Sequence, residues 1–491
     1  MGARAWALLL VLCGTIFLEG IDVAMLAVAI PSIRADLGLE TGTAAWVMSA
    51  YVLGYAGFTL LGGRAADLLG RRRMFLFWLT VFLLFSGLGG FATDGWMLIV
   101  ARFVTGVSAA FMTPAALSLI TTSYEEGPQR NKALLVFAGT GAGGFSLGLV
   151  IGGLLTELGW RWVFFAPVLL AGALLAAAVR VIPAQPAPPR AKGGFDTLGA
   201  ITAAGAMLLT AYGIVRLEHG LVGWPLTAGA VAAGLLLVGT FVAVERRSAA
   251  PLVRLGIFRM SSVVRADLGA LLFVGAFFGF QFVVTLYLQE LRGWSSLQTA
   301  VALVIMGCDA ILAPTLTPKL VERFGNARVI LGGFVLAVVA YGLFLPVGMD
   351  WTYMAMLPTL FLAGVAFALA YGPLTIAATD GVAASEQGLA GGLLHTATQF
   401  GSAVGISAVT AVYGLSKPEG PATDAESTLT AFRAALTVPV VMVVVGLVLS
   451  GVGVWGSQGR RPGKRRSERR GESYGASSGG AAVGSPSSSH Q

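Results

Sequence analysis

Charged residues are scarce in this chain, and cysteine and histidine are nearly absent. Asp, Glu, Lys and Arg make up 11% of the 491 residues and hydrophobic residues make up 56%, whereas an average soluble domain is about 25% charged. The two cysteines, Cys13 and Cys308, lie in separate apolar stretches, and only three histidines are present. This composition indicates a polytopic membrane protein, and it argues against a disulfide framework, a metal site and redox chemistry.

Long apolar stretches predict an all-α protein that crosses the membrane fourteen times. A helix needs about 20 apolar residues to span the hydrocarbon core. The first stretch begins near the N-terminus, but it continues to Ile30 without a cleavage site, so it is interpreted as a span and not as a signal peptide. The predicted spans are Ala5 to Ile30, Thr43 to Gly63, Met74 to Ala92, Trp96 to Thr121, Ala133 to Thr156, Trp162 to Ile182, Leu198 to Val215, Pro225 to Val244, Ala266 to Gln289, Gln298 to Pro318, Ala327 to Val347, Tyr353 to Ala378, Gly388 to Tyr413 and Ala431 to Val454.

Basic residues cluster on one side of this predicted topology. With the N-terminus inside, 25 of the 32 Lys and Arg residues fall in cytoplasmic segments. This distribution fits the positive-inside rule and predicts a multi-pass protein of the cell membrane with both termini in the cytoplasm. The net charge of +8 then reflects topology, so no nucleic-acid partner is expected.

A loop pattern recurs eight spans apart. G-R-A-A-D-L-L-G-R-R-R (63–73) follows the second predicted span, and P-K-L-V-E-R-F-G-N-A-R (318–328) follows the tenth. Both place an acid three residues before a glycine. Two six-span halves in the same orientation, separated by two inserted spans, explain this offset.

The two halves and the insert define the expected domain organisation. A Pro-rich stretch between the halves is typical of an extended tether, and the Ser-, Gly- and Arg-rich C-terminus is expected to be disordered. The predicted units are an N-terminal six-helix bundle (1–182), a cytoplasmic linker (183–197), a two-helix insert with its cytoplasmic loop (198–265), a C-terminal six-helix bundle (266–456) and a basic cytoplasmic tail (457–491).

Four motifs occur in order along the first half. They are D-V-A-M-L-A-V-A-I-P (22–31), the loop 63–73, A-R-F-V-T-G (101–106) and G-F-S-L-G-L-V-I-G-G (144–153). They resemble D-x-T-V-V-N-V-A-L-P, G-x-x-x-D-R-x-G-R-R, R-x-x-x-G and G-x-x-x-G-P-x-x-G-G of the major facilitator superfamily, specifically its fourteen-span drug:proton antiporters. Leu68 and Leu149 replace the usual arginine and proline. The resemblance covers essentially residues 1–456 and implies the major facilitator fold and drug efflux.

Carboxylates inside the first span are the most unusual feature. Glu19 and Asp22 are three residues apart and so lie on nearly one face of a helix, where a charge is costly and seldom kept without a function. Asp22 and Arg102 lie about 12 Å and about 9 Å from the outer ends of their spans, so they are close enough in depth to interact. The pair either neutralises charge in the scaffold or, as we predict, acts as a switch in which proton binding to a carboxylate releases the arginine.

Three polar groups near the midplane are candidates for a substrate cavity. Glu19 is predicted to bind substrate or to carry a second proton, and Asp309 could do the same. Hydrogen bonds to neighbouring spans would explain both residues equally simply. His395 either relays protons or hydrogen-bonds to a neighbouring helix.

The loop patterns are predicted to form a cytoplasmic latch. The positive-inside rule explains the arginines of the first pattern but not its acid. We expect Asp67 to bond to a helix end or a basic neighbour when the transporter is open to the outside, and to release it on inward opening. The predicted latch residues are Gly63, Asp67, Gly70, Arg71, Arg72, Glu322 and Gly325.

Glycines gather in the fifth and thirteenth spans. They serve ordinary close packing of membrane helices or form surfaces on which the two halves slide. The candidate sliding glycines are Gly144, Gly148, Gly152, Gly153, Gly401 and Gly405.

These features predict a secondary active transporter that exports a small organic compound, such as a drug, antibiotic or metabolite, by proton antiport with alternating access. The expected partners are the substrate and the lipid bilayer, with anionic lipids at the basic tail; a monomer is expected, with protons as coupling ion and no cofactor. The alternatives are a facilitator or importer of a small metabolite, or a non-transporting receptor or scaffold on the same fold. An enzyme is not expected, because no nucleophile and base cluster has a recognisable spacing, and no phosphate-binding loop occurs.

Overall fold

The computed structural model is helical throughout, and no strand occurs in the residues that it describes: 2–39, 41–183, 196–216, 224–248, 251, 253–416 and 425–458. Among these residues, eleven helices are long and apolar enough to cross a membrane. The predicted all-α class is therefore confirmed. Most of the predicted linker and nearly all of the predicted tail lie outside the described residues.

The helices follow the predicted spans in order. The first half holds α1 (Ala3–Leu37), α2 (Thr41–Leu69), α3 (Arg71–Gly90), α4 (Gly95–Ser123), α5 (Pro128–Leu158) and α6 (Trp162–Val181). The inserted pair is α7 (Thr197–Arg216) and α8 (Trp224–Arg247), followed by the short η2 (Leu255–Arg259). The second half holds α9 (Ser261–Leu286), η3 (Tyr287–Leu291), α10 (Ser296–Leu303), η4 (Val304–Cys308), α11 (Asp309–Thr315), α12 (Thr317–Phe324), α13 (Asn326–Phe344), α14 (Tyr353–Thr379), η5 (Ala384–Glu386), α15 (Gln387–Ser416) and α16 (Ala425–Gln458).

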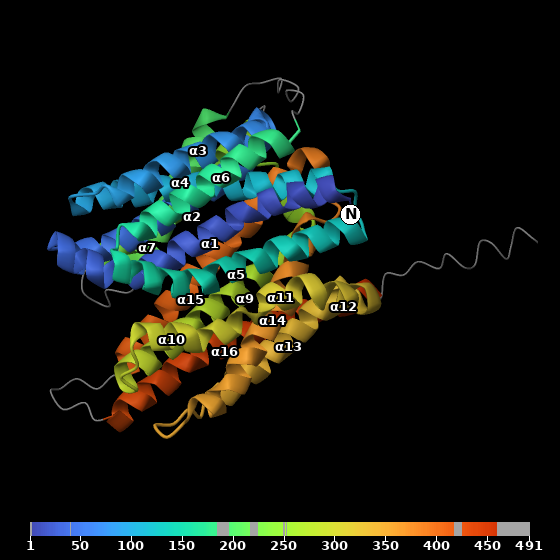
Figure 1. Cartoon of the computed structure of the whole chain (residues 1–491). Helices are drawn as coiled ribbons and strands as arrows, with labels where there is room; N and C mark the ends of the chain where they lie inside the picture. The colour runs from blue at the N-terminus through green and yellow to red at the C-terminus, as the bar shows by residue number, and fades with distance from the viewer. Residues whose placement is uncertain are drawn as a thin grey trace, which may run out of the picture.

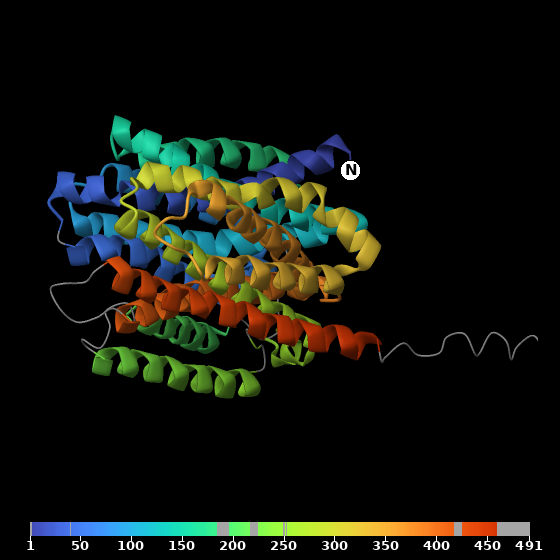
Figure 2. The same ribbon diagram turned by 90° about the horizontal axis from the view of Figure 1, so that it is seen from below.

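Helices of the two halves lie side by side with their long axes roughly parallel (Figure 1). The halves meet where α2 and α4 pack against α15, and where α5 packs against α10, α11 and α14. The inserted α7 packs on α2 and carries α8 on its outer side, so the green pair lies on one flank in Figure 2. The start of α1 and the end of α16 lie at the same end of the molecule (Figure 2). The start of α5 lies here too, because Lys132 lies over the ring of Trp6 near the start of α1. We call this the basic end.

The recurring loop pattern forms two equivalent turns. Gly70 precedes α3 with φ of 99°, and Gly325 precedes α13 with φ of 85°. Both values lie in the left-handed region, which glycine adopts without the steric penalty of a Cβ atom. The glycines shared by the two sequence patterns therefore have a common backbone role.

The tenth predicted span is confirmed as one apolar helical stretch, Leu297–Thr315, but its middle has 3-10 and not α-helical geometry. It consists of α10, a 3-10 turn (η4) and α11. Pro314 inside α11 lacks an N–H group, and proline bends or interrupts helices for this reason. Gly307 in the 3-10 turn packs so closely on Ser146 of α5 that a side chain there would collide. Asp309 follows directly after the 3-10 stretch.

Candidate functional site

Asp22 and Arg102 form a buried ion pair between α1 and α4. Arg102 Nη1 lies 2.5 Å from Asp22 Oδ2, and the two side chains are 3% and 2% exposed. The structure thus joins the two residues that the sequence placed at similar depths. Charges this deeply buried are strongly destabilising unless they are paired, so each group depends on the other.

Tyr51 of α2 completes the surroundings of the arginine. The Arg102 Cζ atom lies 4.4 Å from the centre of the Tyr51 ring, which is a cation–π contact. Arg102 Nε and the Tyr51 hydroxyl have no hydrogen-bond partner among the described residues. The guanidinium is therefore held by one carboxylate oxygen and one aromatic face.

Glu19 is held one helical turn nearer the basic end. Its Oε2 atom accepts hydrogen bonds from the Tyr55 hydroxyl at 3.1 Å and from the Thr113 hydroxyl at 2.8 Å. Unlike the buried Asp22, Glu19 is partly exposed. Two hydroxyl donors stabilise its charge, and its exposure leaves room for a further contact. The hydrogen-bonded alternative from the sequence is thus observed, and it is compatible with a cavity role.

One tyrosine of the second half lies near this carboxylate and begins a row of aromatic rings. Tyr371 of α14 lies within electrostatic range of Glu19. From Tyr371 a row of rings crosses α14 and α9 and reaches α5, with successive centroid distances of 5.1, 4.5, 5.7 and 5.8 Å. The row consists of Tyr371, Phe367, Phe277, Phe278 and Phe145. A carboxylate beside a row of aromatic rings suits a compound with an apolar body and a polar or cationic group.

The other two cavity candidates lie apart from this cluster. Asp309 is 2% exposed, and its backbone oxygen would lie 3.3 Å from a methyl group on Gly139 of α5. It therefore sits where the halves meet. His395 of α15 is 4% exposed, and its Nε2 atom has no hydrogen-bond partner in the described part of the chain. Within that part no hydrogen bond or ion pair joins either residue to Glu19 or Asp22.

At the basic end, Asp67 connects the two halves. Its carboxylate accepts hydrogen bonds from the backbone N–H groups of Gly388 at 3.2 Å and Leu389 at 3.1 Å, in the first turn of α15. Arg71 forms an ion pair with Asp67 at 2.9 Å and also donates to the carbonyl of Ala384. A carboxylate at a helix N-terminus is favoured by the helix dipole. Gly63 allows this contact, because a side chain there would collide with the backbone of Gly388.

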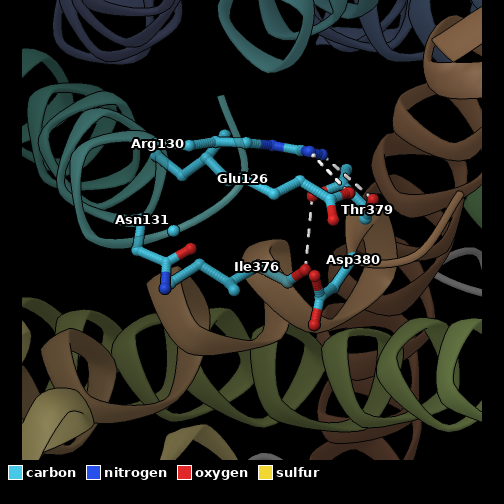
Figure 3. A pocket seen from close by; sticks show the side chains of 8 residues that line it. Glu126, Arg130, Asn131, Ile376, Thr379 and Asp380 are labelled. Carbon is cyan, nitrogen blue, oxygen red and sulfur yellow. Dashed lines mark hydrogen bonds and ion pairs between the residues drawn. The ribbon is translucent and has the colours of Figure 1, made fainter. Parts of the chain in front are cut away.

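Arg130 makes a second connection, which the sequence analysis did not single out. Its guanidinium donates to the carbonyl of Thr379 at 3.0 Å, at the end of α14, and to Gln387 Oε1 at 3.2 Å. Glu126 pairs with it at 3.0 Å (Figure 3). A cation at a helix C-terminus is favoured by the dipole. The first half therefore binds both ends of the α14–α15 connection. Its negative charge contacts the positive end of α15, and its positive charge contacts the negative end of α14.

Two predicted latch residues do not bridge the halves. Arg72 donates to the carbonyls of Ile182 at 2.9 Å and Val179 at 3.2 Å, so it closes the end of α6 within its own half. Glu322 is exposed, and no hydrogen bond or ion pair involves it among the described residues. The second loop pattern shares the glycine turn with the first, but Glu322 does not share the helix-end contact of Asp67.

Most of the candidate sliding glycines pack within a half, which corrects their predicted position. Methyl groups at Gly144, Gly148 and Gly152 of α5 would lie 2.6 to 2.8 Å from the α1 backbone. Gly401 and Gly405 would collide with the backbone of α9. The remaining one, Gly153, faces the other half at Leu297, at 3.3 Å, and Gly139 and Gly143 share that face against α11. The sequence showed that close packing occurs but not which helix is the partner.

Comparison with known proteins assigns the chain to a family. The family model of the Major Facilitator Superfamily matches residues 12–406. The chain belongs to this superfamily. It is 34% identical over 434 residues to the cephamycin export protein CmcT of Amycolatopsis lactamdurans, covering 86% of this chain and 87% of the relative. It is 32% identical over 467 residues to the puromycin resistance protein pur8 of Streptomyces alboniger, covering 91% of each.

A solved structure supports the fold of this major facilitator protein. The human organic anion transporter MFSD10 superposes with a TM-score of 0.64 at 16% identity, covering 91% of this chain and 97% of that one. The resemblance stated from the motifs is thus confirmed at the level of the superfamily. The chain is a multi-pass membrane transporter of small molecules and not an enzyme. Among the described residues no group of three or more His, Cys, Asp or Glu side chains could hold a metal ion.

Proposed function

We propose that this transporter exports a small organic compound in exchange for protons, by alternating access between its two halves. The observation that carries the proposal is the buried Asp22–Arg102 pair beside the partly exposed Glu19. A carboxylate that can pair with either a proton or an arginine has two states of different charge. Relatives of this chain include a cephamycin export protein and a lincomycin resistance protein, which supports export of an antibiotic-like compound.

In this proposal Asp22 takes up the proton and Arg102 is its competitor. Protonation removes the charge that holds the guanidinium and weakens the link between α1 and α4. Glu19 meets the polar group of the substrate, and the aromatic row from Tyr371 accommodates the apolar body. Asp309 and His395 would contribute to the substrate path at positions separate from Glu19. Asp309 suits a second contact between the halves, because it begins α11, which packs against α5 of the other half.

The proposed architecture has fourteen spans. Two six-helix bundles, 1–182 and 266–456, would be joined by a linker (183–197) and a two-helix insert (198–265), with a basic tail (457–491) near anionic lipids. The basic end would face the cytoplasm, with both termini there and the protein a monomer. Asp67, Arg71 and Arg130 would then hold the cytoplasmic side closed, and their release would accompany inward opening, as Gly70 and Gly325 keep the loop turns in shape.

Transport in inside-out membrane vesicles tests the proposal. Puromycin, lincomycin and cephamycin are the first probes, because relatives of this chain are named as resistance or export proteins for these compounds. With an acidic lumen, we expect a transported probe to accumulate above its equilibrium level and the luminal pH to rise as it enters. A protonophore should abolish the accumulation. If the probe only equilibrates across the membrane, with or without the pH gradient, the protein is a facilitator and proton antiport is overturned.

A further inference from the structure

We propose that Tyr51 is a positioning residue of the coupling site. Its aromatic ring keeps the Arg102 guanidinium in place when Asp22 takes up a proton, and so sets the pH range over which the pair opens. The inference rests on the proposed proton switch at Asp22, and its test separates the two claims.

The incomplete hydrogen bonding of Arg102 is the first observation. A guanidinium carries five N–H donors, yet the described structure gives this side chain one carboxylate partner, at 2.5 Å. Its Nε atom has no partner there, and the side chain is 3% exposed, so water does not replace the missing bonds over most of its surface. The Tyr51 ring, with its centroid 4.4 Å from Cζ, is the other group that contacts the charge.

The ring acts unequally on the two protonation states. While Asp22 is ionised, its charge neutralises the guanidinium, and the ring adds little. Once Asp22 is protonated, the ring remains as the group that stabilises the cation. A cation–π contact is strongest where water is excluded. The ring therefore favours the protonated state of Asp22. Removing the ring should lower the pH at which half of the Asp22 side chains are protonated.

Other ionisable groups near the pair have separate partners or positions. On α1, Glu19 accepts hydrogen bonds from Tyr55 and Thr113. On α7, Tyr212 stacks on Trp46, and Arg216 lies over the Tyr212 ring. On α15, which packs on α2 and α4, the ionisable groups are His395 and Tyr413, and the Tyr413 hydroxyl donates to Glu290. On α5, the face against α1 carries Gly144, Gly148 and Gly152 beside Asp22 and, near the basic end, Lys132, which lies over the Trp6 ring.

The two tyrosines of α2 divide the site between them. Tyr51 and Tyr55 are one helical turn apart and pack edge to face, with centroids 5.9 Å apart. The Tyr55 hydroxyl donates a hydrogen bond to Glu19, whereas Tyr51 contacts Arg102 through its ring. The Tyr51 hydroxyl has no partner among the described residues. The ring and not the hydroxyl should therefore carry the effect.

An infrared titration of the purified protein in liposomes tests this inference without a known substrate. The carboxyl band of Asp22 is identified by its loss in Asp22→Asn, and a Glu19→Gln background removes the overlapping band. The titration midpoint is then measured for Tyr51→Phe, for Tyr51→Leu, and for phenylalanines with one, two or three ring fluorines at position 51. Fluorine lowers the electron density of the ring face while nearly preserving its shape.

We expect Tyr51→Phe to keep the wild-type midpoint and Tyr51→Leu to move it about one pH unit toward acid, equivalent to about a tenfold change in proton affinity. Each added fluorine should move the midpoint further in the same direction. If Tyr51→Leu fails to fold, the fluorinated series decides.

Unchanged midpoints across the fluorinated series would overturn the role of the ring. A shift in Tyr51→Phe as large as that in Tyr51→Leu would overturn it as well, since the hydroxyl would then be responsible. If the wild-type protein shows no Asp22-dependent band at any pH, the proton switch itself is wrong, and the inference fails with it.

Discussion

Two acids three residues apart on one helix have different surroundings. Asp22 is buried against an arginine, whereas Glu19 is partly exposed and held by two hydroxyl groups. The first environment suits a group whose charge alternates during coupling. The second suits a carboxylate that is oriented by hydrogen bonds and partly accessible before a ligand arrives. The two acids, which form one feature of the sequence, therefore have separate partners in the structure.

Replacing Glu19 with glutamine tests this division. Glutamine keeps an acceptor for Tyr55 and Thr113 but removes the negative charge, so only the attraction for a cation is lost. We expect the initial transport rate of puromycin, which carries an amine, to fall about tenfold or more, and that of a neutral aromatic compound to change by less than about twofold. Glu157→Gln, at the exposed end of α5, is the control. Equal loss for both probes would show that Glu19 does not select charge.

The sequence could predict part of this site. The positions of Asp22 and Arg102 along their predicted spans were enough to place them at similar depths in the membrane, because the rise per residue of a helix is constant. Tyr51, Tyr55 and Thr113 were missed, since tyrosine and threonine are ordinary in membrane helices and their role depends on which face of α2 and α4 meets α1. The spacing of four between the tyrosines was the one available signal. Arg130 was counted only as a topology signal, although Glu126 precedes it by four residues.

At the basic end of the molecule, charged side chains of the first half bind to helix ends of the second half. Asp67 lies at the positive end of α15 and Arg130 at the negative end of α14, so each charge is favoured by a helix dipole as well as by hydrogen bonds. Separation of the halves would leave these groups to water, where charged side chains are well solvated. Such contacts can form and break without leaving a buried charge unpaired, which suits a latch.

A bulky residue at position 63 should prevent this latch from closing. Valine there would collide with the backbone of Gly388 and hold α2 away from α15. We expect Gly63→Val to reach the membrane at the wild-type level, to lose transport, and to show faster hydrogen exchange in the first turn of α15. Gly239→Val on α8 is the matched control, because nothing lies within 4 Å of a methyl group there. Wild-type transport by Gly63→Val would refute the latch.

Element boundaries followed from hydrophobicity, but helix partners and the 3-10 stretch did not. The glycines of the fifth span correctly indicated close packing, yet three of the four candidates pack on α1 within the same half. Small residues permit approach by any helix, so their sequence does not specify which one. The 3-10 stretch before Asp309 was also missed, because a lone glycine in an apolar stretch is compatible with a regular α-helix.

At the scale of the whole molecule, the structure shows helices of two halves that meet along α2–α15 and α5–α11. The two chain ends described, the start of α1 and the end of α16, lie at one end (Figure 2). If the halves alternate as proposed, movement of the molecule and binding of a proton are separate steps. A mutation at Asp22 should therefore uncouple transport without stopping the alternation.

The most direct measurement compares exchange with accumulation in the Asp22→Asn protein, reconstituted in liposomes with a compound that the wild-type protein transports. We predict that labelled compound still exchanges against unlabelled compound at a rate within about tenfold of wild type, because the halves still alternate. An imposed pH gradient should no longer drive accumulation. Asp36→Asn, at the end of the same helix in an exposed pair with Arg161, should retain both activities. Accumulation by Asp22→Asn that still follows the pH gradient would contradict the assignment of Asp22 as the coupling residue.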